Sequence, residues 1–262
     1  MPTTGPFSVT PMHLTPRYPP CDGRNFWNLS ARDPGLSLDP HLGQGRADMQ
    51  FRWLFWIAVV AGASYFPATW VLPDGAGLTA WKGLGVGLLA LWAALNARSA
   101  SGWAIAAVLA LGATGDVLLD AMGLTVGAVA FLAGHLLAAG FYWVWRRPDL
   151  RGAAPIAIGR LVLIPAIAWF LPADRAAAPG IALYASGLAL MAAAAWVSRF
   201  PRLLVSRGAL FFAASDLLIF ARMGPLAHSA APDLLVWPLY FGGQAMIAWG
   251  VVAYLRRGAG TG

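Results

Sequence analysis

Residues 102–145 have the sequence GWAIAAVLALGATGDVLLDAMGLTVGAVAFLAGHLLAAGFYWVW, and this stretch decides the fold class. It contains two apolar runs, 102–120 and 123–145, separated by a short break. A helix that crosses the hydrocarbon core of a bilayer needs about 20 mostly apolar residues. Each run has about this length, so the pattern predicts two transmembrane helices that are joined by a tight connection.

The same alternation of apolar runs and short polar breaks extends from Arg52 almost to the C-terminus. It predicts an all-α fold, a polytopic membrane bundle of about eight transmembrane helices. The second and fifth runs are short or interrupted by Gly and Pro, so their ends are the least defined. The expected spans are 52–72, 80–97, 102–120, 123–145, 156–172, 180–198, 207–223 and 233–255.

The composition excludes a water-soluble domain of this size. The chain is 59% hydrophobic and 11% charged, whereas soluble domains have about 25% charged residues. Its net charge of +7 comes from Arg clusters between the apolar runs. Such clusters are typical of the loops of membrane proteins and not of a nucleic-acid interface. The single cysteine, Cys21, excludes an intrachain disulfide and a zinc site built from cysteines.

The Arg residues also predict the orientation. With a cytoplasmic N-terminus, eleven Arg after the tail lie on the inside, and only Lys82, Arg175 and Arg222 lie on the outside. Cytoplasmic loops carry the excess of Lys and Arg in membrane proteins. We therefore expect an integral protein of the bacterial inner membrane with both termini in the cytoplasm, which agrees with an even number of spans.

Residues 1–48 differ from the rest of the chain. They hold eight of the 19 prolines, contain no apolar run and lack the features of a signal peptide. This composition predicts a disordered N-terminal tail, followed by a transmembrane domain over 49–262. A natural start at Met49, directly before the first apolar run, is the alternative.

The two halves of the membrane domain show a weak internal similarity. Residues 115–119 (GDVLL) resemble 215–219 (SDLLI), and residues 131–135 (FLAGH) resemble 240–244 (YFGGQ). We interpret this as a four-plus-four duplication with parallel copies. Chance similarity between helices rich in small residues is the alternative. A duplication would place Asp116 and His135 opposite Asp216 and Gln244.

Ionisable residues within the spans indicate a functional site. A charged Asp in the middle of a membrane helix costs about 2.5–3.5 kcal/mol, so it is retained where it pairs with another group or has a function. Asp216 and Asp116 lie deep in the seventh and third spans. A purely structural role, in which each Asp bonds a neighbouring helix, is the alternative.

Other polar residues within the predicted spans are weaker candidates for the functional site. Each also fits an ordinary structural role: a helix end where exposure is cheap, a buried His bonded to a carbonyl, a Lys that snorkels, or polar side chains that join helices. Arg222 and His228 are expected to be solvated. The candidates are Asp120, one turn after Asp116; His135, with Tyr142 two turns along; Lys82; and Tyr240 with Gln244.

The depth of the polar residues is consistent across helices that run in alternating directions. In the predicted topology they lie in the outer half of their spans, with His135 near the middle. Scattered polar residues would have no reason to agree in this way. The pattern predicts one shared cavity that opens toward the non-cytoplasmic side.

Taken together, these segments resemble the YhhN family of lysoplasmalogenases, which are eight-span membrane proteins. The matching pieces occur in the family's order and extend over nearly all of residues 52–257. The family usually has Pro after its Lys in the second helix, whereas Gly83 follows here. The pieces are Lys82, residues 115–119, the helix with Phe131, His135 and Tyr142, the segment GALFFAASD at 208–216 with Ser215 and Asp216, and the helix with Tyr240 and Gln244.

The resemblance implies hydrolysis of the vinyl ether bond of a lysoplasmalogen, with a lysophospholipid and bilayer lipids as partners. We expect no cofactor and no nucleic-acid partner and assign no metal ligand, and whether a metal is needed is left open. This reaction needs a protonated carboxylic acid and a second carboxylate, and burial beside a like charge favours such a pair. We assign Asp116 and Asp216 to it, without choosing the acid. His135, Tyr240 and Gln244 would position water or the head group, Lys82 would meet the phosphate, and Asp120, Tyr142 and Ser215 would support the site.

Two other functions remain open. A metal-dependent hydrolase would use Asp116, Asp120, His135 and Asp216, although zinc sites of hydrolases usually contain two or three nitrogen ligands. A proton-coupled transporter would use the paired intramembrane Asp residues. The sequence has no Gly-rich phosphate loop and no evident Ser-His-Asp motif. Head-group preference and oligomeric state are left open.

Overall fold

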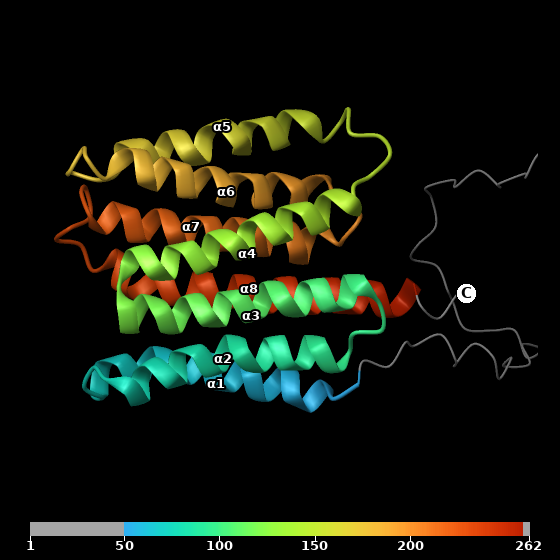
Figure 1. The fold of residues 1–262 in the computed structure, drawn as a ribbon, viewed down its shortest axis with the longest axis horizontal. Coiled ribbons are helices and arrows are strands. Elements are labelled where there is room, and N and C mark those ends of the chain that lie inside the picture. Colours follow the sequence, from blue (N-terminus) through green and yellow to red (C-terminus); the bar gives the residue numbers. More distant parts are fainter. Residues whose placement is uncertain (1–49, 259–262) are drawn as a thin grey trace, which may run out of the picture. The chain divides into compact units, whose positions relative to one another are not determined.

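The computed structural model describes residues 50–258, which form a bundle of eight α-helices (Figure 1). Apart from one isolated bridge between Arg146 and Ser198, the regular structure in this range is helical, so the predicted all-α bundle is confirmed. The predicted tail, 1–48, lies outside the described residues. The helices are α1 (Arg52–Val71), α2 (Ala76–Leu95), α3 (Ala100–Met122), α4 (Leu124–Val144), α5 (Ala154–Phe170), α6 (Ala178–Val197), α7 (Arg207–Arg222) and α8 (Ala231–Gly258), with a π-helical turn, η2 (Arg202–Ser206), before α7.

The lengths and composition of the helices make this an integral membrane protein. Among the described residues, seven helices are long and apolar enough to cross a membrane. Helix α5 is also apolar but has 17 residues, about 25 Å at 1.5 Å per residue, which is the lower limit for a span. Large apolar side chains such as Val60, Val129 and Leu183 are 67%, 64% and 69% exposed, as expected of a surface that faces lipid.

Helix boundaries differ from the predicted spans at a few ends. Helix α2 begins at Ala76 instead of residue 80, α8 continues to Gly258, and η2 extends the seventh span toward its N-terminus. Apolarity marks the part of a helix within the bilayer. The helix itself continues further, because its backbone hydrogen bonds are satisfied internally.

Local signals explain where several helices begin. The Ser99 hydroxyl accepts a hydrogen bond from the Gly102 amide at 3.3 Å and caps α3. Pro155 and Pro179 lie in the first turns of α5 and α6, where a missing amide hydrogen has no cost. Between α3 and α4 the chain turns at Gly123, whose φ of 90° is a conformation that glycine adopts readily.

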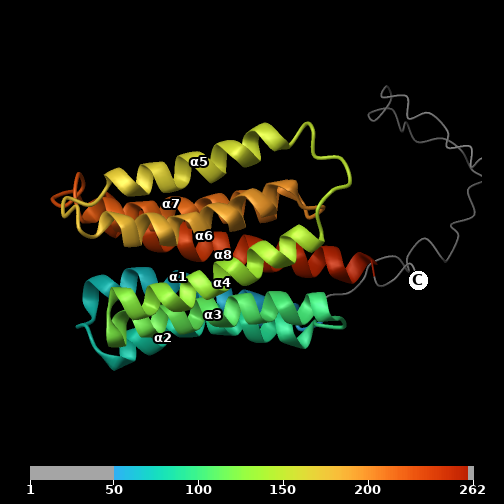
Figure 2. The same cartoon turned by 45° about the horizontal axis from the view of Figure 1, so that its top comes forward.

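Successive helices run in alternating directions, and α8 lies between two groups (Figures 1 and 2). One group contains α1 to α4 and the other α5 to α7, and α4 packs against α6 across them. Helix α8 contacts α1, α2, α3 and α7. The start of α1 and the end of α8 therefore lie at the same end of the bundle.

Small residues allow α7 and α8 to approach closely. A Cβ atom on Gly208 would lie 2.7 Å from the Gly243 carbonyl oxygen, and one on Gly243 would lie 2.6 Å from the Gly208 carbonyl oxygen. Such contacts are typical of membrane helices, where close packing replaces the hydrophobic effect. The crossing brings Asp216 of α7 and Tyr240 of α8 into the same region of the bundle.

Candidate functional site

A polar cavity of about 280 Å³ lies where α3 and α7 end and where α2, α4 and α8 begin. Six of the residues proposed from the sequence line it, whereas His135 and Gln244, which were expected in the same cavity, do not. Tyr184 and Arg222 also line it. The predicted lining residues are Lys82, Asp116, Asp120, Ser215, Asp216 and Tyr240.

Asp116 of α3 is 3% exposed and accepts a hydrogen bond from the Tyr240 hydroxyl of α8 at 2.8 Å. The approach of α8 depends on Gly112, one turn before Asp116. A Cβ atom on Gly112 would lie 2.7 Å from Nε2 of Gln244 and 3.5 Å from the Tyr240 hydroxyl. The glycine thus leaves room for the polar side chains of α8 beside the aspartate.

Asp216 of α7 is 5% exposed and accepts a hydrogen bond from the Tyr184 hydroxyl of α6 at 2.6 Å. The same hydroxyl oxygen lies 3.0 Å from Nε2 of His135 on α4, and this Nε2 is 3.7 Å from Oδ2 of Asp216. A tyrosine hydroxyl has one proton, which Tyr184 donates to Asp216. His135 must then donate from Nε2. The three residues form a connected chain across three helices.

Tyr184 was not among the residues expected from the sequence. It is a weakly polar residue in an apolar helix rich in Ala, and it has no charged neighbour in the sequence. Its depth in α6 was the available signal. Arg222 was expected to be solvated. Its side chain is 51% exposed and forms an ion pair with Asp233, but it also lines the cavity.

Lys82 and Asp120 form an ion pair, with 2.7 Å between Nζ and Oδ1. Their side chains are 13% and 26% exposed, so this pair is more accessible than the buried aspartates. Lys82 is thus fixed by a carboxylate partner on α3 instead of only extending to the interface. Because both side chains are more exposed than the two buried aspartates, the pair marks the more open side of the cavity.

Three predicted residues line a different space. His135, Tyr142 and Gln244 border a small neighbouring cavity of about 10 Å³. The Tyr142 hydroxyl is buried and has no hydrogen-bond partner within residues 50–258. His135 connects the two spaces, because its ring also reaches Tyr184. Ser215 lines the larger cavity, and its hydroxyl donates to the Val236 carbonyl of α8 at 2.9 Å.

Aromatic rings pack against the residues that contact the buried aspartates. Phe212 and Phe131 pack edge-to-face on Tyr240, with centroid distances of 5.0 and 5.8 Å, and Phe212 also contacts His135 at 4.9 Å. Gly115 permits this arrangement, since a Cβ atom there would lie 2.9 Å from the Phe131 ring. Apolar surroundings strengthen electrostatic interactions within the site.

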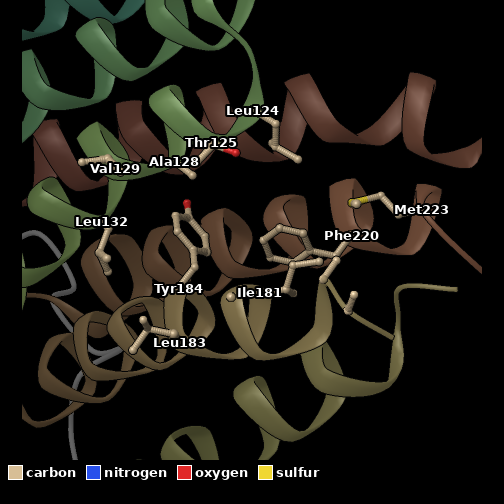
Figure 3. Close-up of a pocket in the computed structure, with 13 residues that line it drawn as sticks. Leu124, Thr125, Ala128, Val129, Leu132, Ile181, Leu183, Tyr184, Phe220 and Met223 are labelled. Atoms are coloured by element: carbon tan, nitrogen blue, oxygen red, sulfur yellow. The ribbon is translucent and has the colours of Figure 1, made fainter. Parts of the chain in front are cut away.

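An apolar groove of about 500 Å³ adjoins the polar cavity (Figure 3). Residues of α4, α6 and α7 line it, and Leu124, Ala128, Tyr184 and Phe220 line both spaces. In Figure 3 the ring of Tyr184 lies beside the ring of Phe220, and its hydroxyl points toward α4. The polar cavity therefore adjoins a space suited to hydrocarbon.

The side chains considered as metal ligands are distributed over different partners. Asp120 pairs with Lys82, Asp116 with Tyr240, and Asp216 with Tyr184. In the described part of the chain, no three His, Cys, Asp or Glu side chains gather closely enough to hold a metal ion. The placement of these residues therefore lends no support to the metal-dependent alternative.

Comparison with known proteins gives one match. The model of the YhhN family matches residues 77–251, a range that begins in α2, ends in α8 and covers more than half of the chain. It includes each residue that lines the polar cavity. Neither a curated protein nor a solved structure matches this chain.

Proposed function

Because this chain belongs to the YhhN family, we propose that it hydrolyses the vinyl ether bond of a lysoplasmalogen or a related ether lysophospholipid. The products are a fatty aldehyde and a glycerophospho-alcohol. One observation carries the proposal: two buried aspartates line one cavity, and each accepts a hydrogen bond from a tyrosine hydroxyl. Buried carboxyl groups of this kind suit acid–base chemistry on an uncharged bond.

The reaction needs one proton donor and one water molecule. A carboxylic acid protonates the alkene carbon that is not bonded to oxygen, and the ether oxygen shares the resulting positive charge as an oxocarbenium ion. Water adds to the charged carbon and loses a proton, which gives a hemiacetal. The hemiacetal separates into an aldehyde and an alcohol. The net change is the addition of one water across the cleaved bond.

Asp116 and Asp216 fill the two required roles in this proposal. One carboxyl group donates the proton, and the other, as carboxylate, stabilises the cation and accepts a proton from water. The tyrosines fix both side chains: Tyr240 holds Asp116 from α8, and Tyr184 holds Asp216 from α6. These two hydrogen bonds, donated from different helices, hold the carboxyl groups in place, so that little reorientation is needed during the reaction.

The charged residues at the open side suit the head group. The Lys82 ammonium lies in the cavity beside Asp120, and the Arg222 guanidinium lies in its lining. Cations of this kind bind phosphate through charge-assisted hydrogen bonds. A phosphate there would leave the glycerol and the ether oxygen directed toward the buried aspartates.

Aldehyde release tests the function. Purified protein in detergent is given an alkenyl lysophospholipid, and the wild type is compared with Asp116→Asn, Asp216→Asn and the control Asp149→Asn. Asp149 is exposed in the loop between α4 and α5. We expect each cavity variant to lose at least about 100-fold in turnover, since general acid–base groups contribute about 10²–10⁴-fold. Wild-type activity that survives in both variants would remove the aspartates from the mechanism.

One observation also favours a second function. The chain from His135 through Tyr184 to Asp216 links three groups that can exchange protons, as in proton-coupled transporters. Folded wild-type protein that releases no aldehyde, but couples a proton gradient to solute uptake in proteoliposomes, would support transport instead of hydrolysis.

A further inference from the structure

We infer that the apolar groove between α4, α6 and α7 binds the single hydrocarbon chain of the lipid substrate and places its first carbons beside Tyr184. The inference rests on the proposed function and specifies how the substrate lies. The head group would occupy the polar cavity and the chain the groove. The vinyl ether carbons, which join these two parts, would then lie at the boundary between the spaces.

The groove has the chemistry of a hydrocarbon site. Of the side chains that line it, only Thr125 and Tyr184 carry a polar atom. Its volume of about 500 Å³ lies within the range of about 300–1,000 Å³ that is usual for small-molecule sites. A lipid chain is the apolar ligand that a protein in a bilayer meets at the highest concentration.

Tyr184 marks the boundary between the two spaces. Its hydroxyl donates to Asp216, and its ring lines the groove next to Phe220, at a centroid distance of 5.6 Å (Figure 3). The change from polar to apolar lining thus occurs within one side chain. In an alkenyl lysophospholipid the corresponding change occurs at the vinyl ether, so the two boundaries coincide when the substrate lies in this orientation.

The groove is open toward lipid. Val129 of α4 and Leu183 of α6 line it and are 64% and 69% exposed, which leaves it open at the side of the bundle. A second apolar groove, of about 460 Å³ between α4, α5 and α6, shares no lining residue with the polar cavity. We therefore assign the single chain of a lysolipid to the groove that shares lining residues with the polar cavity, and not to this second groove.

Two glycines provide a matched test. Gly180 of α6 lines the groove beside the aspartates, and Gly140 of α4 lines the second groove. A Cβ atom at either position would meet nothing within 4 Å, so both helices have room for a larger side chain. Gly180→Leu would fill only the proposed chain site, and Gly140→Leu would fill only the other groove.

The readout is the ratio of kcat/KM for hexadecenyl to that for octenyl lysophospholipid. We expect Gly180→Leu to lower this ratio at least about tenfold, since the mismatch of a single methylene in an apolar pocket already changes kcat/KM by about 10–200-fold. Gly140→Leu should keep the wild-type ratio. Equal ratios in the two variants, with aldehyde still released, would overturn the groove assignment and leave the proposed function intact.

A binding measurement on the wild-type protein tests the groove assignment without enzyme turnover and without a variant that has to fold. An alkyl lysophospholipid, which has no vinyl group, carries a diazirine within the first half of its chain and is photolysed with the wild-type protein. We expect the label in residues 124–132 and 180–184, and competition by unlabelled alkyl lysophospholipid. Label confined to residues that line the second groove, or label that does not compete, would refute the inference even if no hydrolysis is found.

Discussion

The most informative perturbation of the site is Tyr184→Phe, which removes one oxygen atom and keeps the ring. That oxygen makes two hydrogen bonds, to Asp216 at 2.6 Å and to His135 at 3.0 Å. Hydrogen bonds between membrane helices contribute about 0.6 kcal/mol on average and about 1.7 kcal/mol at most. Loss of both bonds should therefore lower the free energy of unfolding by about 1–3 kcal/mol.

Tyr142→Phe is the matched control. Its hydroxyl is also buried, but it has no hydrogen-bond partner in the part of the chain that the structure describes. Removing an unpaired buried hydroxyl ends a desolvation penalty and breaks no bond. We expect this variant to be as stable as the wild type or more stable by about 1 kcal/mol.

Thermal unfolding of the purified proteins in one detergent, followed by tryptophan fluorescence, compares the two variants. We expect the midpoint of Tyr184→Phe several degrees below that of Tyr142→Phe. Midpoints that coincide, or a lower midpoint for Tyr142→Phe, would refute the argument that the Tyr184 hydroxyl stabilises the chain of polar residues between α4, α6 and α7.

Three further predictions concern the proposed site. Lys82→Ala should raise KM for the lysophospholipid more than it lowers kcat, and Lys82→Arg should recover part of the loss, as steady-state kinetics would reveal; an unchanged KM would remove Lys82 from head-group binding. Gly112→Ala should lower both thermal stability and aldehyde release, because its Cβ would lie 2.7 Å from Nε2 of Gln244, whereas Gly140→Ala should change neither. Chelator treatment should leave aldehyde release unchanged, because the proposed proton donor is a carboxyl group; activity that disappears and returns with added metal would contradict this.

The sequence predicts the helices well because lipid imposes a simple rule on them. About 20 apolar residues cross the bilayer, and the Arg residues between them mark the breaks. The same rule makes Asp116 and Asp216 conspicuous, since a charge within an apolar run is costly unless it pairs with another group or has a function. That they share a cavity could be predicted because the polar residues lie at a similar depth in helices that run in alternating directions.

Hydrogen-bond partners could not be predicted in the same way. Tyr184 is only weakly polar, so it leaves almost no signal in an apolar helix. Which helices meet depends on close contacts such as that of Gly208 with Gly243, and many glycines in the sequence make no such contact. The four-plus-four duplication stays a prediction. The observed bonds link Asp116 to α8 and Asp216 to α6 and do not by themselves reveal a repeat.

The position of Tyr184, with its hydroxyl in the polar cavity and its ring in the groove, has a consequence for the products of the proposed reaction. Cleavage at this residue would leave the aldehyde on the hydrocarbon side and the glycerophospho-alcohol on the aqueous side. Each product would then depart into a different phase without passing the other. Such separation would hinder recombination and would keep the site clear for the next lipid, even where aldehyde accumulates in the surrounding bilayer.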